Sequence, residues 1–166
     1  MRIAVVVGNP KPASRTLNVA TAVADLLAAE LSPDAGHLVV DLAEYAGDLF
    51  DWGAPRLTEL TEQVASAGLI IAASPTYKAT YTGMLKAFFD RYGNNGLAGS
   101  VAVPLMTGGA PIHMLAVEVH LRPLLVELGA AVPARGLYVT EPEFGDLSAP
   151  LGRWTGAAIP LLRHAL

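Results

Sequence analysis

The chain has 166 residues, enough for one domain with its own hydrophobic core, and no stretch of it resembles a linker to a second domain. Its formal net charge of −4 argues against nucleic acid as a main partner, and no apolar run reaches the length of a membrane span. Cysteine is absent, so disulfides, thiolate chemistry and cysteine-ligated iron–sulfur clusters are excluded, and a redox role would need a bound organic cofactor.

Short apolar runs alternate along the chain with segments in which apolar residues recur at helical spacing. The runs predict strands over Ile3–Val7, His37–Leu42, Leu69–Ala73, Val101–Met106 and Arg135–Val139. The helical spacing predicts helices over Leu17–Leu31, Pro55–Ala67, Thr80–Tyr92, Ile112–Leu128 and Leu151–Leu166. Pro123 should kink the fourth helix near Val119 or His120, because proline has no N–H for the helical hydrogen bond.

Five strand–helix units in succession predict a single α/β domain over residues 1–166, with an open, doubly wound parallel sheet. The apolar content of 52% and the charged content of 16% fit a sheet that helices cover on both faces, and they also fit a subunit interface. The first residues run straight into a strand without the small-residue cleavage site of a signal peptide. We therefore expect a cytoplasmic protein.

Three loops at the carboxyl ends of predicted strands carry the unusual residues, and ligands of such sheets bind at this edge. They are the first loop, Gly8–Thr16, the second loop, Ser74–Lys78, and the third loop, Thr107–Pro111. The first loop leads from a strand into a helix start, where free N–H groups, the hydroxyls of Ser14 and Thr16, and the charges of Lys11 and Arg15 predict a phosphate site. The alternative is an ordinary turn in which Ser14 only caps the helix.

The other two loops predict a place for a planar ring. The second loop contributes Tyr77 and the rigid Pro75, while Gly108 and Gly109 of the third loop would let a flat ring approach the backbone. The first loop is neither a Walker A loop nor a G-x-G-x-x-G fingerprint. A phosphate site beside a ring-binding edge therefore favours a mononucleotide with a large planar ring, and FMN is the obvious candidate.

The three loops also carry motifs of a known family. Residues 8–16 resemble the G-S-P-R…S-x-T loop of the NADPH-dependent FMN reductases, with Asn9 where serine is usual. Residues 74–86 resemble the S-P-x-Y…S/T-G-x-L-K segment, and residues 107–123 resemble the T-G-G…L-R-P segment. The chain is most similar to the flavin reductases that serve two-component monooxygenases of the alkanesulfonate type.

The resemblance implies a flavodoxin-like three-layer sandwich with strand order 2-1-3-4-5, and it implies FMN as the cofactor. In this family Ser14, Arg15 and Thr16 would hold the phosphate, residues 75–77 would run along the flavin, and residues 107–109 would reach the ring edge through backbone groups. The full set of implied binding residues is Gly8, Asn9, Lys11, Ser14, Arg15, Thr16, Ser74, Pro75, Thr76, Tyr77, Lys78, Thr107, Gly108 and Gly109.

The implied activity is hydride transfer from NADH or NADPH to FMN, with reduced flavin supplied to a partner monooxygenase. No catalytic side chain and no metal site are expected, since the flavin carries the chemistry. A homodimer or homotetramer is expected. In some sulfonate-type reductases an aromatic residue or histidine interrupts the helix after Thr-Gly-Gly and reaches a subunit interface, and here Val119 occupies that position.

Other functions stay open at this point. One is an FMN-retaining reductase of quinones, azo dyes or chromate, and another is a flavodoxin-like electron carrier without nicotinamide turnover. A family member with an empty site is a third, although Lys11, Ser14 and Tyr77 argue against it. The choice between NADH and NADPH also stays open, because several cations could meet a 2′-phosphate.

Overall fold

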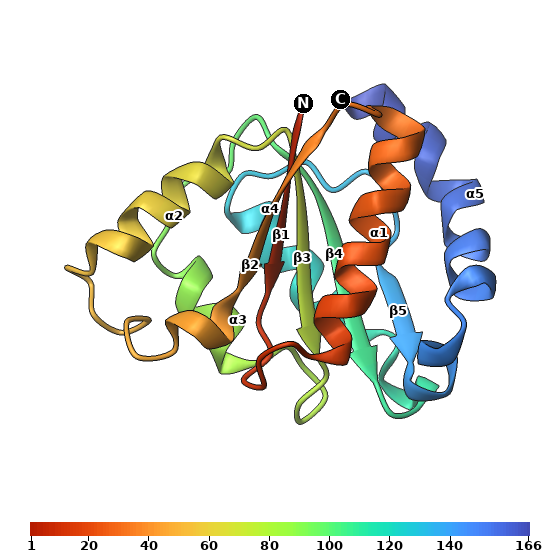
Figure 1. Ribbon diagram of the computed structural model, residues 1–166, viewed down its shortest axis with the longest axis horizontal. Coiled ribbons are helices and arrows are strands. Elements are labelled where there is room, and N and C mark those ends of the chain that lie inside the picture. The colour runs from red at the N-terminus through yellow and green to blue at the C-terminus, as the bar shows by residue number, and fades with distance from the viewer.

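Five parallel strands form one sheet in the order β2-β1-β3-β4-β5 in the computed structural model, which describes residues 1–166 (Figure 1). The strands are β1 (Arg2–Val7), β2 (Gly36–Asp41), β3 (Leu69–Pro75), β4 (Val101–Gly108) and β5 (Leu137–Thr140). This order confirms the predicted flavodoxin-like sheet. The carboxyl ends of the strands meet at one edge, where the loops that follow them gather (Figure 1).

Helices cover both faces of the sheet, with α1 and α5 on one face and α2, α3 and α4 on the other (Figure 1). They are α1 (Arg15–Leu31), α2 (Pro55–Ala65), α3 (Gly83–Phe89), α4 (Arg122–Glu127) and α5 (Ser148–Ala165). Short 3₁₀ turns follow β2 (Leu42–Tyr45), β4 (Pro111–His113) and β5 (Glu141–Gly145), and a π-helical turn precedes α4 (Val117–Leu121). None of the helices combines the length and the apolar character needed to cross a bilayer.

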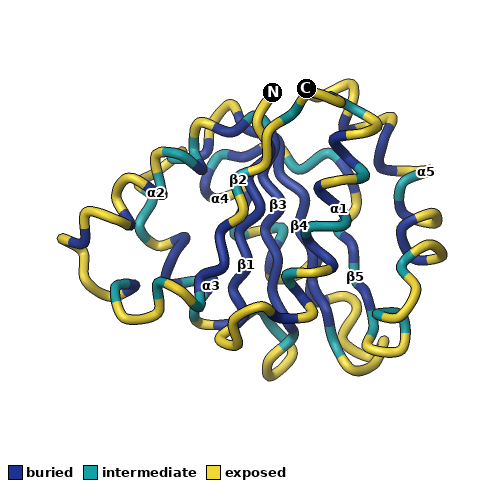
Figure 2. The backbone as a smooth tube through the Cα atoms, viewed as in Figure 1, coloured by how far each residue is buried: buried dark blue, intermediate teal, exposed yellow.

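The core lies in two layers on either side of the sheet because neighbouring strand residues point to opposite faces. In β1, Ile3 and Val5 pack toward α1 and α5, whereas Ala4 and Val6 pack toward the opposite face. Every residue of β3 is buried, whereas the edge strand β2 is exposed over much of its length (Figure 2). The continuous apolar run of the central strand therefore reflects burial on both faces.

Helix α3 is shorter than the predicted helix over 80–92. It begins at Gly83, because the Thr82 side chain accepts a hydrogen bond from the Leu85 amide and so caps the helix. Asp90 ends it. The two residues before Thr82 belong to the turn that follows β3 and not to the helix.

The bulky apolar stripe of α3 is used inside the subunit. Leu85, Phe88 and Phe89 are fully buried and pack in the core on this face of the sheet. The aromatic residues of the loop before α2 lie at the surface. Phe50 and Trp52 are 79% and 68% exposed, so they do not pack in the core.

The predicted helix over 112–128 is broken into three pieces: a 3₁₀ turn, a π-helical turn and α4. The Arg122 amide donates to the carbonyl of Val117, five residues earlier, which is the π-helical pattern. The next residue, Pro123, has no N–H to donate. The predicted distortion at Val119 and His120 is thus present, as a widened turn in place of a simple kink.

Pro104 lies in the middle of β4, opposite Ala72 of β3, and not near the exit of the strand. The Ala102 amide, two residues earlier and on the same side, donates to Ala131, and the pairing of β4 with β5 starts only at Leu105. The missing N–H of Pro104 therefore faces the gap between these two contacts. The proline occupies a place where the ladder needs no donor.

The last elements are displaced by two or three residues. The fifth strand begins at Leu137 and not at Arg135, and the closing helix begins at Ser148 and not at Leu151. The segment between them, predicted as a loop, contains the 3₁₀ turn Glu141–Gly145. This turn lies at the same edge of the sheet as the three loops.

Candidate functional site

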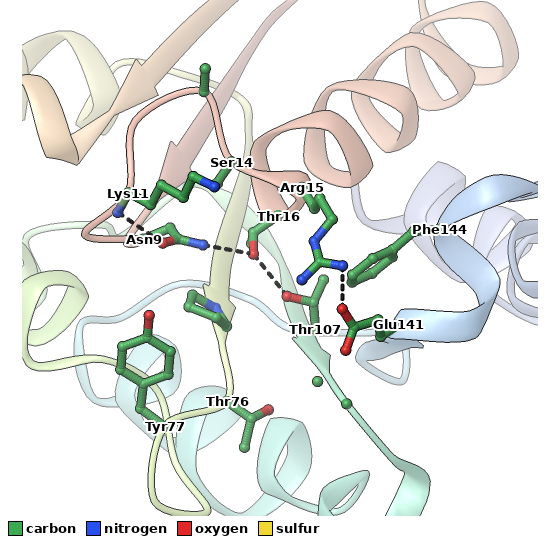
Figure 3. Close-up of a pocket in the computed structure, with 14 residues that line it drawn as sticks. Asn9, Lys11, Ser14, Arg15, Thr16, Thr76, Tyr77, Thr107, Glu141 and Phe144 are labelled. Atoms are coloured by element: carbon green, nitrogen blue, oxygen red, sulfur yellow. Dashed lines mark hydrogen bonds and ion pairs between the residues drawn. The ribbon is translucent and has the colours of Figure 1, made fainter.

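A cavity of about 390 Å³ opens at the carboxyl edge of the sheet, where the three loops meet (Figure 3). Its size falls within the usual range of small-molecule sites. The residues that line it are Asn9, Lys11, Ala13, Ser14, Arg15, Thr16, Pro75, Thr76, Tyr77, Thr107, Gly108, Gly109, Glu141 and Phe144. The last two come from the turn after β5, so four segments build the cavity.

The start of α1 supplies unpaired N–H groups to this cavity. The Ser14 hydroxyl accepts a hydrogen bond from the Leu17 amide at 3.1 Å and caps the helix, which confirms the capping role. A phosphate contact of Ser14 stays a prediction. The amides of Arg15 and Thr16 lie in the first turn and have no acceptor within the protein. With the positive end of the helix dipole, they make this end of the cavity suited to an anion.

Buried side chains hold the first loop in place. The Asn9 amide group donates to the Thr16 hydroxyl at 3.2 Å, and its oxygen accepts from the Lys11 amide at 3.0 Å (Figure 3). The Thr16 hydroxyl lies 2.8 Å from that of Thr107 in the third loop. Asn9 thus orders the loop from within, and it occupies the Lys11 amide that a ligand could otherwise use.

The loop turns at Ala13, which has a positive φ of 50° and donates its N–H to the Asp41 carboxylate at 2.9 Å. Asp41 is buried at the end of β2 and also accepts from the Ala43 amide. A non-glycine residue in the left-handed region is strained and needs such support. The carboxyl end of β2 therefore fixes the shape of the first loop.

Two cations and one carboxylate face the cavity. The Arg15 guanidinium forms an ion pair with Glu141 and lies over the Phe144 ring, 5.1 Å from its centroid (Figure 3). Lys11 makes no ion pair. Glu141 is the only acidic residue in the lining, so the cavity keeps a net positive charge.

The opposite wall is formed by the second and third loops. Pro75 and Tyr77 line it, and Tyr77 is half exposed. The Thr76 amide donates to the carbonyl of Thr107 at 2.7 Å, which joins the two loops. The aromatic ring of Tyr77 and the pyrrolidine ring of Pro75 give this wall a surface suited to a flat ligand.

Tyr138 of β5 supports this wall from behind. Its hydroxyl lies 3.2 Å from the Thr76 hydroxyl and 3.4 Å from the carbonyl of Ala110. A Cβ atom at Gly108 would lie 2.0 Å from the same hydroxyl oxygen. The packing of Tyr138 is therefore one reason for a glycine at position 108, and the expected approach of a flat ring to Gly108 stays a prediction. Gly109 has no such neighbour.

The family can be named on this geometry together with the sequence match. Residues 1–143 match the NADPH-dependent FMN reductase family, and the match includes all three loops and the turn after β5 as far as Glu143. The chain belongs to this family.

Curated relatives match this chain with different coverage. The FMN reductase (NADPH) of Escherichia coli strain K12 is 39% identical over 93 residues, which is 56% of this chain and 49% of that protein. The chain thus matches about half the length of this relative. The NADH-dependent FMN reductase SfnE of Pseudomonas putida is 32% identical over an aligned 174 residues, covering 96% of this chain and 91% of that protein.

A solved structure extends the match to the whole fold. The apo form of an NADH:FMN oxidoreductase, EmoB, superposes with a TM-score of 0.87 at 30% sequence identity. The superposition covers 99% of this chain and 89% of that protein. The flavodoxin-like FMN reductase architecture is therefore shared along the entire chain.

Most of the residues that the family resemblance implied line the cavity, and three do not. Gly8 packs against α3, where an added Cβ would lie 2.4 Å from that of Leu85. Ser74 is fully buried and accepts a hydrogen bond from the Thr82 amide at 2.9 Å. Lys78 lies outside the lining, in the exposed turn after Tyr77. The first two shape the site from beneath.

The residues that sequence reasoning missed come mainly from the end of β5. Glu141 and Phe144 line the cavity, and Tyr138 supports its wall. No family motif marks them in the sequence. One signal was available, because β5 is a parallel strand and its carboxyl end must reach the same edge as the three loops.

Proposed function

We propose that this protein is an NAD(P)H-dependent FMN reductase that binds FMN in the cavity at the carboxyl edge of the sheet. The single observation that carries the proposal is the meeting of the three family motifs around one cavity of suitable size. The names of the relatives, which are FMN reductases using NADPH or NADH, support it.

The donor set fits a phosphate group. The unpaired amides of Arg15 and Thr16, the Ser14 hydroxyl and the Lys11 ammonium group are all donors, and Ser14 and Lys11 carry no carboxylate partner. Backbone amides at a helix start combined with a nearby cation are a common arrangement for phosphate. The phosphate of FMN would be held here.

The opposite wall fits a flat ring. Pro75 and Tyr77 offer apolar surface, and Gly109 leaves the backbone of the third loop uncovered. The hydrogen bond from the Thr76 amide to the Thr107 carbonyl, and that between the Thr76 and Tyr138 hydroxyls, hold this wall in one arrangement. The ring of FMN would lie against it, and the backbone groups of residues 107–109 would bind the ring edge.

When bound, FMN supplies a ring system that takes up hydride from a reduced nicotinamide. The chain contributes binding and orientation, which can account for a large part of such a rate enhancement. Hydride transfer needs no acid or base side chain, and Glu141, the one carboxylate of the lining, is engaged with Arg15. The loops align the reactants and hold the phosphate at a distance from the ring wall.

Further properties follow from the same family assignment. The reduced flavin would be passed to a partner monooxygenase, as the alkanesulfonate-type resemblance implies. A homodimer or homotetramer and a cytoplasmic location remain predictions. Val119 at the π-helical turn is 57% exposed and stands at the position that the resemblance places near a subunit interface.

The test is an assay of NADH and NADPH oxidation by the purified protein, with and without added FMN. We expect oxidation that requires FMN and sequential kinetics with FMN as a substrate. A protein that keeps its flavin and reduces quinones with ping-pong kinetics would instead be the quinone, azo-dye or chromate reductase. Absence of nicotinamide oxidation with FMN bound would favour the electron carrier and contradict the proposal.

A further inference from the structure

The ion pair between Arg15 and Glu141 connects the phosphate end of the cavity to the turn after β5. The two side chains are 64% and 51% exposed, and both line the cavity. Figure 3 shows the Arg15 guanidinium directed at Glu141 and beside the Phe144 ring. A residue expected to bind phosphate is therefore already engaged by an anion of the protein.

Glu141 has no other task in the structure. Its carboxylate makes no hydrogen bond except the one with Arg15. The turn that carries it is held by its neighbour Glu143, whose carboxylate accepts from the Thr140 amide and hydroxyl at 2.8 Å each. The Thr140 amide lowers the pKa of Glu143, so this anchor stays charged at neutral pH. The charge of Glu141 is not needed for the turn to form.

The Glu141 carboxylate lies beside Arg15, to which the phosphate group of a flavin would also be attracted. A phosphate monoester carries about 1.5 to 2 negative charges at neutral pH, and it would seek the same guanidinium. Glu141 would repel it and compete for Arg15, whereas Lys11 and the helix start would still attract it. A flavin without a phosphate group would be neither repelled by Glu141 nor attracted by Lys11 and the helix start.

We infer that Glu141 is a specificity-determining residue that competes with the flavin phosphate for Arg15 and so keeps FMN binding weak enough for release. This inference rests on the proposed function and deepens it, because it distinguishes a site that exchanges FMN from one that retains it. The carboxylate reduces the advantage of FMN over riboflavin, which shares the ring but lacks the phosphate.

The experiment compares the dissociation constants of FMN and riboflavin for the flavin-free protein, followed by flavin fluorescence. Glu141→Gln should bind FMN about three- to tenfold more tightly, from the removal of a surface ion pair and of one repulsive charge. Its riboflavin affinity should not change. The gain should shrink as the salt concentration rises.

Two further variants separate the mechanism from a general effect of charge. Glu59→Gln removes one carboxylate from the exposed face of α2, outside the cavity, and should leave the affinities of both flavins unchanged. In the Arg15→Ala background, Glu141→Gln should keep only the part of its effect on FMN that comes from the lost repulsive charge, because the guanidinium for which the anions compete is gone.

The outcomes are distinct. Unchanged or weaker FMN binding by Glu141→Gln, or an equal gain for riboflavin, would overturn the inference and leave the proposed function standing. A wild-type protein that binds neither flavin would overturn the proposed function and the inference with it.

Discussion

The hydroxyl of Thr16, in the first turn of α1, lies 2.8 Å from the hydroxyl of Thr107, at the end of β4. Both residues are about 2% exposed, and Asn9 also donates to Thr16. This contact joins the end of the cavity at the start of α1 to the third loop across the sheet. The relative position of the two loops therefore depends on a buried pair of hydroxyls.

Thr107→Val keeps the shape of the side chain and removes its hydroxyl. We expect a loss of about 1 kcal/mol in the free energy of unfolding and severalfold weaker FMN binding, because the Thr16 hydroxyl loses a partner. Urea denaturation and FMN titration measure the two effects. The control is Thr61→Val on the exposed face of α2, whose hydroxyl bonds only within its own helix. If Thr61→Val weakened FMN binding as much as Thr107→Val, the role assigned to the Thr16–Thr107 contact would be contradicted.

Gly108→Ala should be destabilising through a steric clash with Tyr138. The added Cβ would lie 2.0 Å from the Tyr138 hydroxyl oxygen and 3.0 Å from its Cζ, so the ring must shift. Overpacking of this kind costs about 1–3 kcal/mol. In Tyr138→Phe/Gly108→Ala the closest atom is gone, and thermal unfolding should show partial recovery relative to Gly108→Ala alone. If the double variant unfolds at the same temperature as Gly108→Ala alone, the steric explanation is refuted.

Ala79→Gly should stabilise the protein. Lys78 and Ala79 form a two-residue turn between Tyr77 and Thr80, and both have positive φ, 50° and 66°. A side chain in the left-handed backbone region costs about 1 kcal/mol, and glycine removes this cost. Glycine also makes the unfolded chain more flexible, which offsets part of the gain. We expect a net gain of up to about 0.5 kcal/mol by urea denaturation.

The matched control for this turn is Ala65→Gly at the end of α2. There the backbone is helical, so the same substitution should destabilise the protein by about 0.5–1 kcal/mol. Equal signs for the two variants would mean that strain in the turn does not contribute to stability.

Glu118 should make stability depend on pH. Its burial raises the pKa, but hydrogen bonds from Arg122 and the Gly136 amide, both at 2.6 Å, outweigh burial and lower the pKa below its ordinary value of 4.5. The stabilisation is present above that value and lost as the pH falls toward the folded-state pKa.

The measurement is the free energy of unfolding as a function of pH for the wild-type protein and Glu118→Gln. The wild-type advantage should be constant near neutrality and should narrow below about pH 4.5. An advantage that stays constant down to strong acid would show that the charge of Glu118 does not contribute. Because other carboxylates titrate in both proteins, only the difference between the curves is informative.

The strands were predictable from the sequence because burial on both faces leaves continuous apolar runs, as in β3. The ends of helices were not, because tertiary contacts decide them. Helix α3 begins at Gly83, three residues after the predicted start, because Ser74 binds the amide of the capping residue Thr82. Pro123 and the π-helical turn divide the next predicted helix. The helix propensities of neighbouring residues do not depend on such tertiary contacts, so they cannot predict them.

The same division holds for the site. The first loop was predictable because a strand that turns into a helix through Ser14, Arg15 and Thr16 exposes donors for a local reason. Glu141 and Tyr138 were not, since their importance comes from residues more than sixty positions away along the chain. Composition and spacing do not show which residues far apart in the sequence lie close together in the fold.

The loops at the sheet edge are fastened to one another before any ligand arrives. The Thr82 hydroxyl donates to the carbonyl of Gly8, and the Thr76 amide donates to the carbonyl of Thr107. A ligand therefore meets a preassembled pocket, and its capture needs no rearrangement of the backbone. We expect association rates that rise in proportion to ligand concentration without reaching a plateau, as for a simple collision between rigid bodies.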